Sequence, residues 1–287
     1  MASMRDIKRR KASIQSTGQI TKAMKLVSTV KLQKAKSRAE QARPYSKYMY
    51  DTIVDMLSRT KNINHPYLNG DSDNPKKAVI VITSNRGLAG GYNNNAIKLL
   101  LNSDMPKENV EVYAIGKKGK DALQRRGYEI KADYSEVINE PEYADAKAIG
   151  EVVLKEYTEG NIGEIYLIYT SFKNTVSHEP KLMKLLPISM EDTEEEESSE
   201  KLAPMTFEPD EDEILDAIIP KYMNSLIYGA LVEAVASENG ARMQAMDSAT
   251  SNAEEMIADL SLKYNRARQG AITQELTEII AGAEAIN

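Results

Sequence analysis

The chain lacks cysteine and tryptophan and has only two phenylalanines and two histidines among its 287 residues. Without cysteine it cannot form a disulfide, a thiolate nucleophile or a cysteine-ligated metal site. With His65 and His178 as its only histidines, a histidine-rich metal site is excluded as well. The small supply of large aromatic side chains indicates a modest globular core together with long helices that depend partly on other chains for burial.

Long apolar segments are also missing. No run approaches the roughly 20 residues of a membrane-spanning helix, and the N-terminus has no apolar segment typical of a signal peptide. No histidine has a convincing serine, cysteine or aspartate partner, and the carboxylates follow helix faces or an acidic stretch, so no catalytic group, cofactor site or metal site is expected. We expect a protein of the cytoplasm that reaches a membrane through partners, without direct insertion.

Charge is distributed unevenly around the net value of -6. Residues 5–43 carry twelve basic side chains and only two acidic ones, Asp6 and Glu40. In residues 191–213 every charged side chain except Lys201 is acidic. A basic helix of this kind fits nucleic acid, an acidic membrane surface or an acidic protein, and it can also be a solvated face without a partner.

Both ends of the chain have long helical patterns. Residues 6–43 contain no proline and one glycine, and are rich in good helix formers. Pro44 is expected to interrupt this helix, with the pattern resuming to Leu57. In the C-terminal helix, small and apolar residues recur in alternating steps of three and four, the period of a coiled-coil seam; they are Ala253, Ile257, Leu260, Tyr264, Ala267 and Ala271.

The N-terminal helix has a less regular apolar pattern. Its expected seam residues are Ile7, Ile14, Ile20, Met24 and Val27, so we expect irregular packing in which alanine and serine allow close approach. The two end helices should pair as an antiparallel two-helix coiled coil.

Between the end helices, apolar β-branched runs alternate with helical segments. This order predicts right-handed crossovers and a small, mostly parallel, Rossmann-like α/β sheet. The expected strands are 78–83, 110–115, 164–170 and an edge strand at 180–187, and the expected helices are 93–101, 117–126 and 143–157.

Composition changes mark the expected domain boundaries. Asn, Pro, Gly and Asp make residues 62–77 a linker. The expected parts are an N-terminal coiled-coil helix at 1–60, a Rossmann-like domain at 76–190, an acidic mobile linker at 191–207, and a foot helix leading into the long C-terminal helix at 208–287. Asp210 follows Glu208 and Pro209 in a helix-opening pattern, and Pro220 should break or kink that helix.

A glycine cluster follows the first expected strand. Gly87, Gly90 and Gly91 have the spacing G-x-x-G-G, which differs from the dinucleotide and P-loop fingerprints. A tight strand-to-helix turn explains the glycines as well as a nucleotide site does.

Three motifs in order along nearly the whole chain carry a family resemblance. They are Ile-Thr-Lys-Ala-Met-Lys-Leu-Val at 20–27, Ser-Asn-Arg-Gly-Leu-Ala-Gly-Gly-Tyr-Asn at 84–93, and Tyr-Asn-Arg-Ala-Arg-Gln at 264–269 with Ile-Thr-Gln-Glu-Leu-Thr-Glu-Ile at 272–279. Together they resemble the gamma subunit of bacterial F-type ATP synthases.

The resemblance implies a non-catalytic rotor shaft inside a ring of alpha and beta subunits, with epsilon and a membrane c-ring as further partners, at the cytoplasmic face of the cell membrane. It implies contact or coupling with the catalytic beta subunit at a set of shaft residues: Met24, Arg242, Arg268, Gln269, Thr273 and Glu275. It further implies a foot that touches the ring or epsilon at Phe207, Glu208 and Asp210.

Two alternatives remain at this point. A nucleotide-dependent enzyme built on the α/β domain would bind ATP as an isolated chain. A basic coiled-coil protein that binds nucleic acid would lose affinity steeply with salt. The resemblance implies neither cofactor nor nucleic acid.

Overall fold

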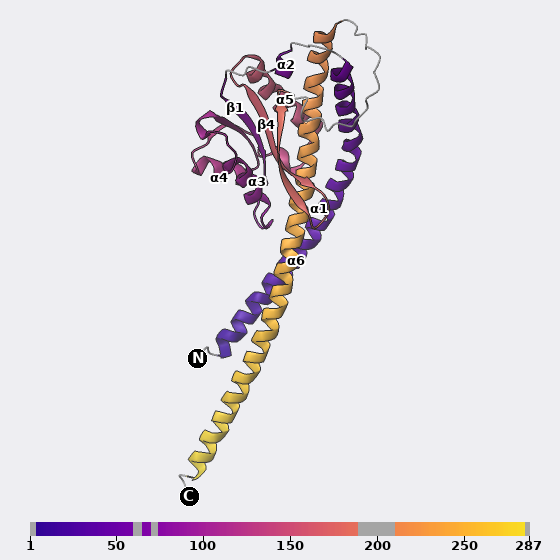
Figure 1. Cartoon of the computed structure of the whole chain (residues 1–287). Helices are drawn as coiled ribbons and strands as arrows, with labels where there is room; N and C mark the ends of the chain where they lie inside the picture. The colour runs from indigo at the N-terminus through magenta and orange to yellow at the C-terminus, as the bar shows by residue number, and fades with distance from the viewer. Residues whose placement is uncertain (1–3, 60–64, 70–73, 189–209, 285–287) are drawn as a thin grey trace. The chain divides into compact units, whose positions relative to one another are not determined.

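The computed structural model describes residues 4–59, 65–69, 74–188 and 210–284. Its contacts divide the chain into a helical unit, Met1–Ser28 with Arg242–Asn287, and an α/β unit, Thr29–Ala241. Two long helices, α1 (Met4–Arg59) and α6 (Glu211–Glu284), contribute to both units (Figure 1). The acidic segment 191–207 lies outside the described residues, and the domain boundaries remain predictions.

A five-stranded sheet of order β3-β2-β1-β4-β5 forms the centre of the α/β unit. Strands β1 (Lys77–Ile82), β2 (Val110–Ile115), β3 (Glu129–Asp133) and β4 (Glu164–Phe172) run parallel, and β5 (His178–Leu186) pairs antiparallel with β4. Each parallel connection carries a helix: α3 (Tyr92–Leu101), α4 (Lys117–Arg125) and α5 (Tyr143–Thr158). Single turns of helix lie at Pro66–Asn69, Lys107–Asn109 and Val137–Asn139.

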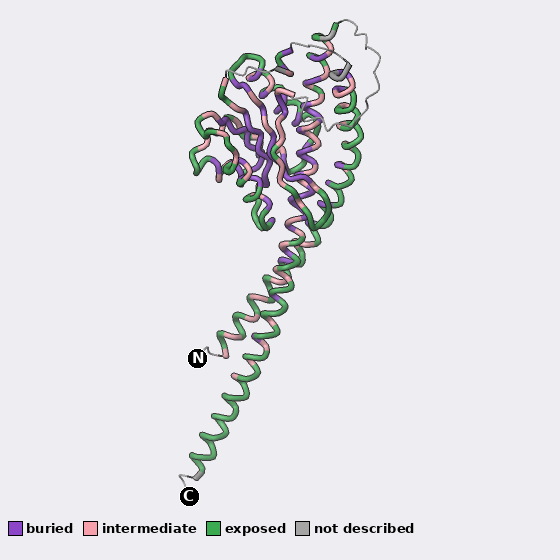
Figure 2. Tube along the Cα trace, viewed as in Figure 1, coloured by how far each residue is buried: buried purple, intermediate pink, exposed green. Residues whose placement is uncertain are grey.

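Alternate residues of the central strands enter two different cores, because successive side chains point to opposite faces of a sheet. Ala78, Ile80 and Ile82 of β1 pack with apolar residues of α1, α5 and the first half of α6. Val79 and Val81 pack with α3 and α4 on the other face. Figure 2 shows the buried residues concentrated in the strands and in the helices that cover them. The predicted fold class, with its mostly parallel sheet between long helices, is confirmed.

The edge strands show how much of the sheet the sequence reveals. β5 was expected as an edge strand, and Pro180, which has no N–H to donate, is tolerated there. β3 was not expected. Its exposed residues Glu129, Lys131 and Asp133 alternate with the half-buried Ile130 and Ala132, and a short charged strand gives little apolar signal.

Neither internal proline ends its helix, so the predicted interruption at Pro44 and the predicted break at Pro220 are wrong, while the alternative of a kink at Pro220 stays a prediction. α1 continues through Pro44 and α6 continues through Pro220. Contacts on both sides of Pro44 hold α1 against α6, since Arg43 pairs with Glu233 and Ser46 contacts Ser225. Around Pro220, α6 is fixed by the burial of Leu215, Ile219 and Met223 in the core. Tertiary packing thus outweighs the missing backbone hydrogen bond.

The two long helices pair antiparallel within each unit. In the helical unit Gly18 lies against Ala253, and Thr21 contacts Thr250. The buried and half-buried positions of α1 follow steps of three and four almost without interruption, which is the coiled-coil period. The regular seam runs Met4, Ile7, Lys11, Ile14, Gly18, Thr21, Lys25, Ser28, Leu32, Ala35, Ala39, Ala42, Ser46, Met49, Ile53 and Met56, and Met24, Arg38, Val54 and Asp55 are half-buried beside it.

This seam corrects two predicted seam positions. Ile20 and Val27 are exposed, and their neighbours Thr21 and Ser28 are buried instead. Small side chains let the helix backbones approach closely, so the pairing does not follow the largest apolar residues. In the described parts of the chain, no helix has a stretch both long and apolar enough to cross a membrane.

Candidate partner-binding surface of the helical unit

The last turns of α6 have no paired helix beside them in the described structure. Gly18 faces Ala253, and the same number of residues separates Met4 from Gly18 as separates Ala253 from Ala267. The described part of α1 therefore begins opposite Ala267. Every side chain of α6 from Arg268 to Ala283 is exposed (Figure 2). Ala271, predicted to lie in the seam, is exposed for this reason.

Four of the predicted contact residues lie on this exposed segment: Arg268, Gln269, Thr273 and Glu275. Arg268 directly follows the last half-buried seam residue, Ala267. Its neighbours at helical spacing are Tyr264, Asn265, Ala271 and Ile272, so no carboxylate of the same helix is placed to pair with it. A guanidinium and an amide on such a surface can donate several hydrogen bonds to a partner.

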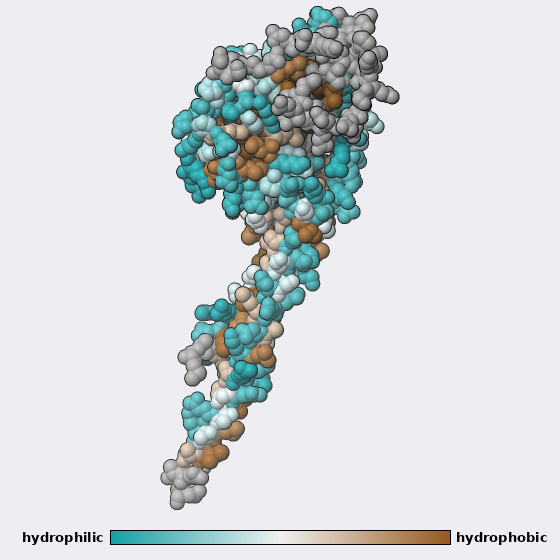
Figure 3. Space-filling view, in the orientation of Figure 1, coloured by the Kyte–Doolittle hydropathy of each residue, from teal (hydrophilic) through white to brown (hydrophobic). Residues whose placement is uncertain are grey.

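An apolar stripe runs along the same segment and was not identified from the sequence. Ile272, Leu276 and Ile279 are 48%, 55% and 64% exposed, and their steps of four and three place them on one face of the helix. Figure 3 shows brown apolar side chains in these last turns. We call these three residues the terminal stripe. Their spacing was a signal available in the sequence, but exposure could only be known once the length of α1 beside α6 was known.

Met24 and Arg242 occupy different environments from the terminal residues. Met24 is half-buried on α1, close in sequence to Lys25, which pairs with Asp247 of α6. Arg242 is only 9% exposed. Little of the Arg242 side chain is therefore accessible to another protein.

The structure describes only one of the three predicted foot residues. Phe207 and Glu208 lie outside the described residues. Asp210 precedes the first residue of α6, and its Oδ1 accepts a hydrogen bond from the backbone N–H of Glu213 at 2.9 Å. This is the position and bond of a helix N-cap.

The carboxyl ends of the parallel strands, where α/β proteins bind nucleotides, are occupied by the chain's own groups. The first three amides of α4 belong to Lys117, Lys118 and Gly119, and they donate to Asn85 Oδ1, to the Ser84 carbonyl and to Thr83 Oγ1. The N–H groups that would hold a phosphate are thereby used within the fold.

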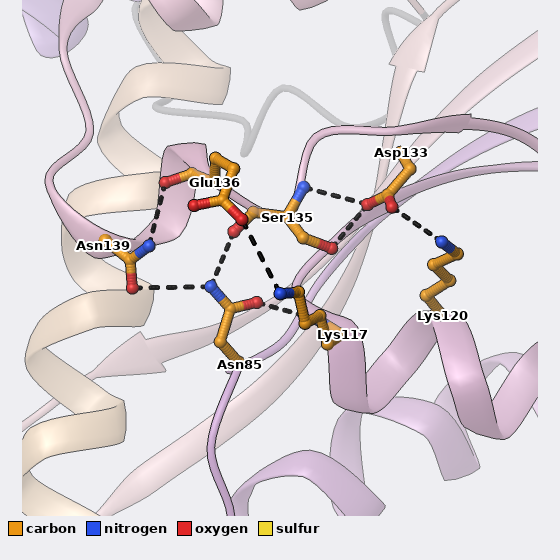
Figure 4. A network of polar contacts seen from close by, with 7 residues as sticks. All are labelled: Asn85, Lys117, Lys120, Asp133, Ser135, Glu136 and Asn139. Atoms are coloured by element: carbon orange, nitrogen blue, oxygen red, sulfur yellow. Dashed lines mark hydrogen bonds and ion pairs between the residues drawn. The ribbon is translucent and has the colours of Figure 1, made fainter.

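The neighbouring side chains close the same edge (Figure 4). Asn85 Nδ2 donates to the Ser135 carbonyl at 2.7 Å, and Lys120 Nζ lies 2.8 Å from Asp133 Oδ2. Burial alone would raise the pKa of Asp133, but hydrogen bonds from Lys120 and Ser135 outweigh it and lower that pKa. The segment that follows β1 is thus bonded to α4 and to the end of β3 through Ser84 and Asn85.

Comparison with known proteins gives a consistent result along the whole chain. A family profile described as ATP synthase matches residues 3–286. A protein of Lachnoclostridium phytofermentans called ATP synthase gamma chain is 68% identical, with 100% of both chains covered. One of Alkaliphilus metalliredigens with the same name is 46% identical, covering 99% of this chain and 98% of the relative. An Acetobacterium woodii protein called ATP synthase gamma chain, sodium ion specific, is 41% identical and covered to 99% on both sides.

Solved structures share the fold at low sequence identity. A chain of the Euglena gracilis mitochondrial ATP synthase aligns with a TM-score of 0.67 and 18% identity, covering 99% of this chain and 94% of that one. A chain of the Tetrahymena thermophila mitochondrial ATP synthase central stalk and c-ring aligns with a TM-score of 0.58 and 23% identity, covering 80% and 99%.

Proposed function

This chain belongs to the family of ATP synthase gamma chains, and from that premise we propose that it is the central rotor shaft of a proton- or sodium-translocating F-type ATP synthase. The observation that carries the proposal is the exposed end of α6. An apolar stripe beside Arg268 and Gln269 is a poor surface to leave in water and a good one to insert into a ring of other subunits.

The shaft is proposed to act by differential contact. Alpha and beta subunits surround the coiled coil, and each rotary angle presents a different side of the shaft to a given beta subunit. Only contacts that differ between two conformations of that beta subunit can shift it from one to the other. The gamma chain is a subunit of an enzyme complex, and we propose that it performs no bond chemistry itself. The use of the α4 amides within the fold supports this.

The proposed contacts with beta fall into two groups. Arg268, Gln269, Thr273 and Glu275 are exposed and are proposed to touch beta directly. Met24 and the buried Arg242 are proposed to influence beta through the position of the helix pair.

The foot is proposed to form the membrane-facing end of the shaft. Phe207, Glu208 and Asp210 are its proposed contacts with epsilon and the c-ring. The protein would then be peripheral, at the cytoplasmic face of a bacterial cell membrane. The coupling ion belongs to the ring, so the gamma chain is compatible with protons or sodium ions.

Reconstitution with alpha and beta subunits tests the proposal. Because the chain has no cysteine, a single Glu108→Cys on the exposed surface of the α/β unit gives a unique site for a bead. We expect ATP-driven rotation of the bead. A complex that hydrolyses ATP with this chain fixed and non-rotating, or subunits that do not bind the chain, would contradict the proposal.

Arg268→Ala with Gln269→Ala tests the contact residues. The pair should leave assembly nearly intact and change ATP turnover several-fold, because a charged hydrogen bond is worth about 1.5–3 kcal/mol. Asp259→Ala with Lys263→Ala is the matched control, since both are exposed on α6 and pair with each other. Turnover per gamma chain that is equal in all three complexes would remove Arg268 and Gln269 from the mechanism.

A further inference from the structure

A pair of hydroxyl groups joins the two long helices in each compact unit. Thr21 Oγ1 and Thr250 Oγ1 lie 2.8 Å apart in the helical unit, and Ser46 Oγ and Ser225 Oγ lie 2.8 Å apart in the α/β unit. The step along α1 from Thr21 to Ser46 equals the step back along α6 from Thr250 to Ser225. Both contacts therefore belong to one pairing register.

Apolar packing by itself specifies the register of the helical unit weakly. Among the seam positions of α1 in this unit, only Met4, Ile7 and Ile14 are large and apolar. In the observed register Met4, Ile7 and Ile14 lie opposite Ala267, Tyr264 and Ile257 of α6. Displacement by one heptad would again set Ile14 opposite Tyr264, or Ile7 opposite Ile257, so these large apolar contacts do not by themselves select one register.

We propose that the two hydroxyl pairs fix the axial register of the helix pair. If α1 were displaced by one heptad in either direction, Thr21 would face Ile257 or Met243. Ser46 would likewise face Val232 or Ile218. A hydroxyl that faces an aliphatic side chain loses its partner on the other helix, and the threonines keep only the contact with a carbonyl of their own helix, so both displaced registers have fewer hydrogen bonds between the helices.

One displaced register offers partial compensation. When Thr21 faces Ile257, Thr250 meets Ser28, so one hydroxyl pair could form again. Thr21 and Ser46 would still face aliphatic side chains in that arrangement. Only the observed register pairs both hydroxyls of α1 with hydroxyls of α6.

Either oxygen of the threonine pair can donate, and the neighbouring carbonyl distances favour one arrangement of the hydrogens. Thr250 Oγ1 lies 2.7 Å from the Met246 carbonyl, and Thr21 Oγ1 lies 3.0 Å from the Gly18 carbonyl. Two hydroxyl hydrogens cannot serve three contacts. With Thr250 donating to the shorter carbonyl contact, Thr21 donates to Thr250. If one hydroxyl is removed, the other can still donate to a carbonyl of its own helix, so the double change is needed to leave no hydroxyl at this position.

The consequence for function rests on the proposed rotor role. A two-helix shaft carries torque only if its two helices do not slide past each other. Thr21, Ser46, Ser225 and Thr250 are positioning residues in this sense, because they would act on the beta subunit through the helices.

Engineered disulfides in the full chain test the register directly, since no native cysteine interferes. Gly18→Cys with Ala253→Cys reports the observed register, because a Cβ at Gly18 would lie 3.4 Å from Ala253 Cβ. Gly18→Cys with Leu260→Cys, and Gly18→Cys with Met246→Cys, report the two displaced registers. Disulfide fractions are measured in a glutathione buffer by non-reducing electrophoresis and mass spectrometry.

Each cysteine pair is compared in three backgrounds. The first keeps all four hydroxyls. The second carries Thr21→Val, Thr250→Val, Ser46→Ala and Ser225→Ala. The third carries Thr21→Ser and Thr250→Ser, which remove the methyl groups but keep the hydroxyls. We expect the displaced disulfides to rise about tenfold or more relative to the native one in the second background alone.

Several results would overturn the proposal. One is a displaced fraction that stays equally low in the second background, since packing alone would then set the register. A second is a first background in which the Gly18→Cys with Ala253→Cys disulfide is not the most abundant. A third is a serine background in which the displaced disulfides rise as much as in the second background. If the four-site variant does not fold by circular dichroism, the two threonine-to-valine changes alone are tested against the same expectations. No alpha or beta subunit is present, so failure here is distinguishable from failure of the rotor proposal.

Discussion

At the scale of single residues, close approach and burial decide the behaviour of His178. This first residue of β5 lies 6.0 Å from the Phe172 ring, measured between ring centroids. It also packs against α6 at Gly240, where an added Cβ would stand 2.6 Å from His178 Cε1. Burial lowers the pKa of His178, and a contact with the Thr175 backbone offsets only part of that effect. At a pH that leaves an exposed histidine half protonated, the imidazole of His178 is therefore mostly neutral.

The lowered pKa of His178 predicts a pH-dependent stability. The unfolded chain binds this proton more readily than the folded chain, so the contribution is present above the ordinary pKa of 6.5. It is lost as the pH falls toward the folded value, at about 1.4 kcal/mol per unit of separation between the two pKa values. Urea unfolding of the whole chain from pH 8 to pH 5 measures it.

His178→Asn is the matched variant, because it keeps a polar side chain that does not titrate in this range. We expect a smaller loss of unfolding free energy between pH 8 and pH 5 in the variant than in the parent chain. All other titratable groups are the same in the two chains, so parallel curves would show that His178 does not carry the effect.

At the scale of elements, the contact between α5 and α6 depends on a missing side chain. A Cβ at Gly150 would lie 2.0 Å from Asn224 Oδ1 and 3.4 Å from Met223 Cε. Both glycine and asparagine are unusual choices for buried helix positions, and together they let the two helices approach closely. Residues of α5 and of α6 lie together in the larger of the two cores.

Gly150→Ala should destabilise the chain although alanine favours the helix. The overlap with Asn224 forces the helices apart, at a cost of about 1–3 kcal/mol, which exceeds the roughly 1 kcal/mol gained in helix propensity. Gly270→Ala is the control, because nothing lies within 4 Å of a Cβ there. Chemical denaturation should show a lower midpoint for the first variant and an equal or higher one for the second. Equal midpoints would mean that α5 shifts without cost.

At the scale of the whole molecule, the long helix α6 does two different jobs along its length. Its first half is buried against the sheet, with Leu215, Ile227 and Leu231 fully enclosed. Its last turns contribute almost nothing to the fold, since every described side chain there is exposed. Stability and partner binding are thereby separated along a single helix.

Replacing the terminal stripe should separate the two properties. Ile272→Gln, Leu276→Gln and Ile279→Gln keep helix propensity and should leave the thermal unfolding of the isolated chain unchanged. Binding to alpha and beta subunits should weaken about tenfold or more, because three apolar side chains would lose their burial. Leu101→Gln, Val152→Gln and Val176→Gln, exposed in the α/β unit, form the control. Unchanged binding of the stripe variant in a pull-down titration would remove the stripe from the interface.

The sequence alone determined the class of structure, because the relevant signals are local. Alternating apolar runs and helical segments predicted the α/β sheet, and β1, β2 and α4 lie within a residue of their expected bounds. The steps of three and four from Ala253 to Ala267 predicted the pairing face of α6. The three motifs predicted the family, because a motif is defined by the order of its residues and needs no knowledge of the fold.

Tertiary structure decided what depends on neighbours distant in sequence. Pro44 and Pro220 continue their helices because packing on both sides holds them, which no local rule can foresee. Thr21 and Ser28 enter the seam in place of Ile20 and Val27 because the approach of α6 favours small side chains there. The exposure of α6 beyond Ala267 follows from the register of two segments over two hundred residues apart. The sequence shows which side chains are hydrophobic, but which of them are buried depends on the segment that the fold packs against them.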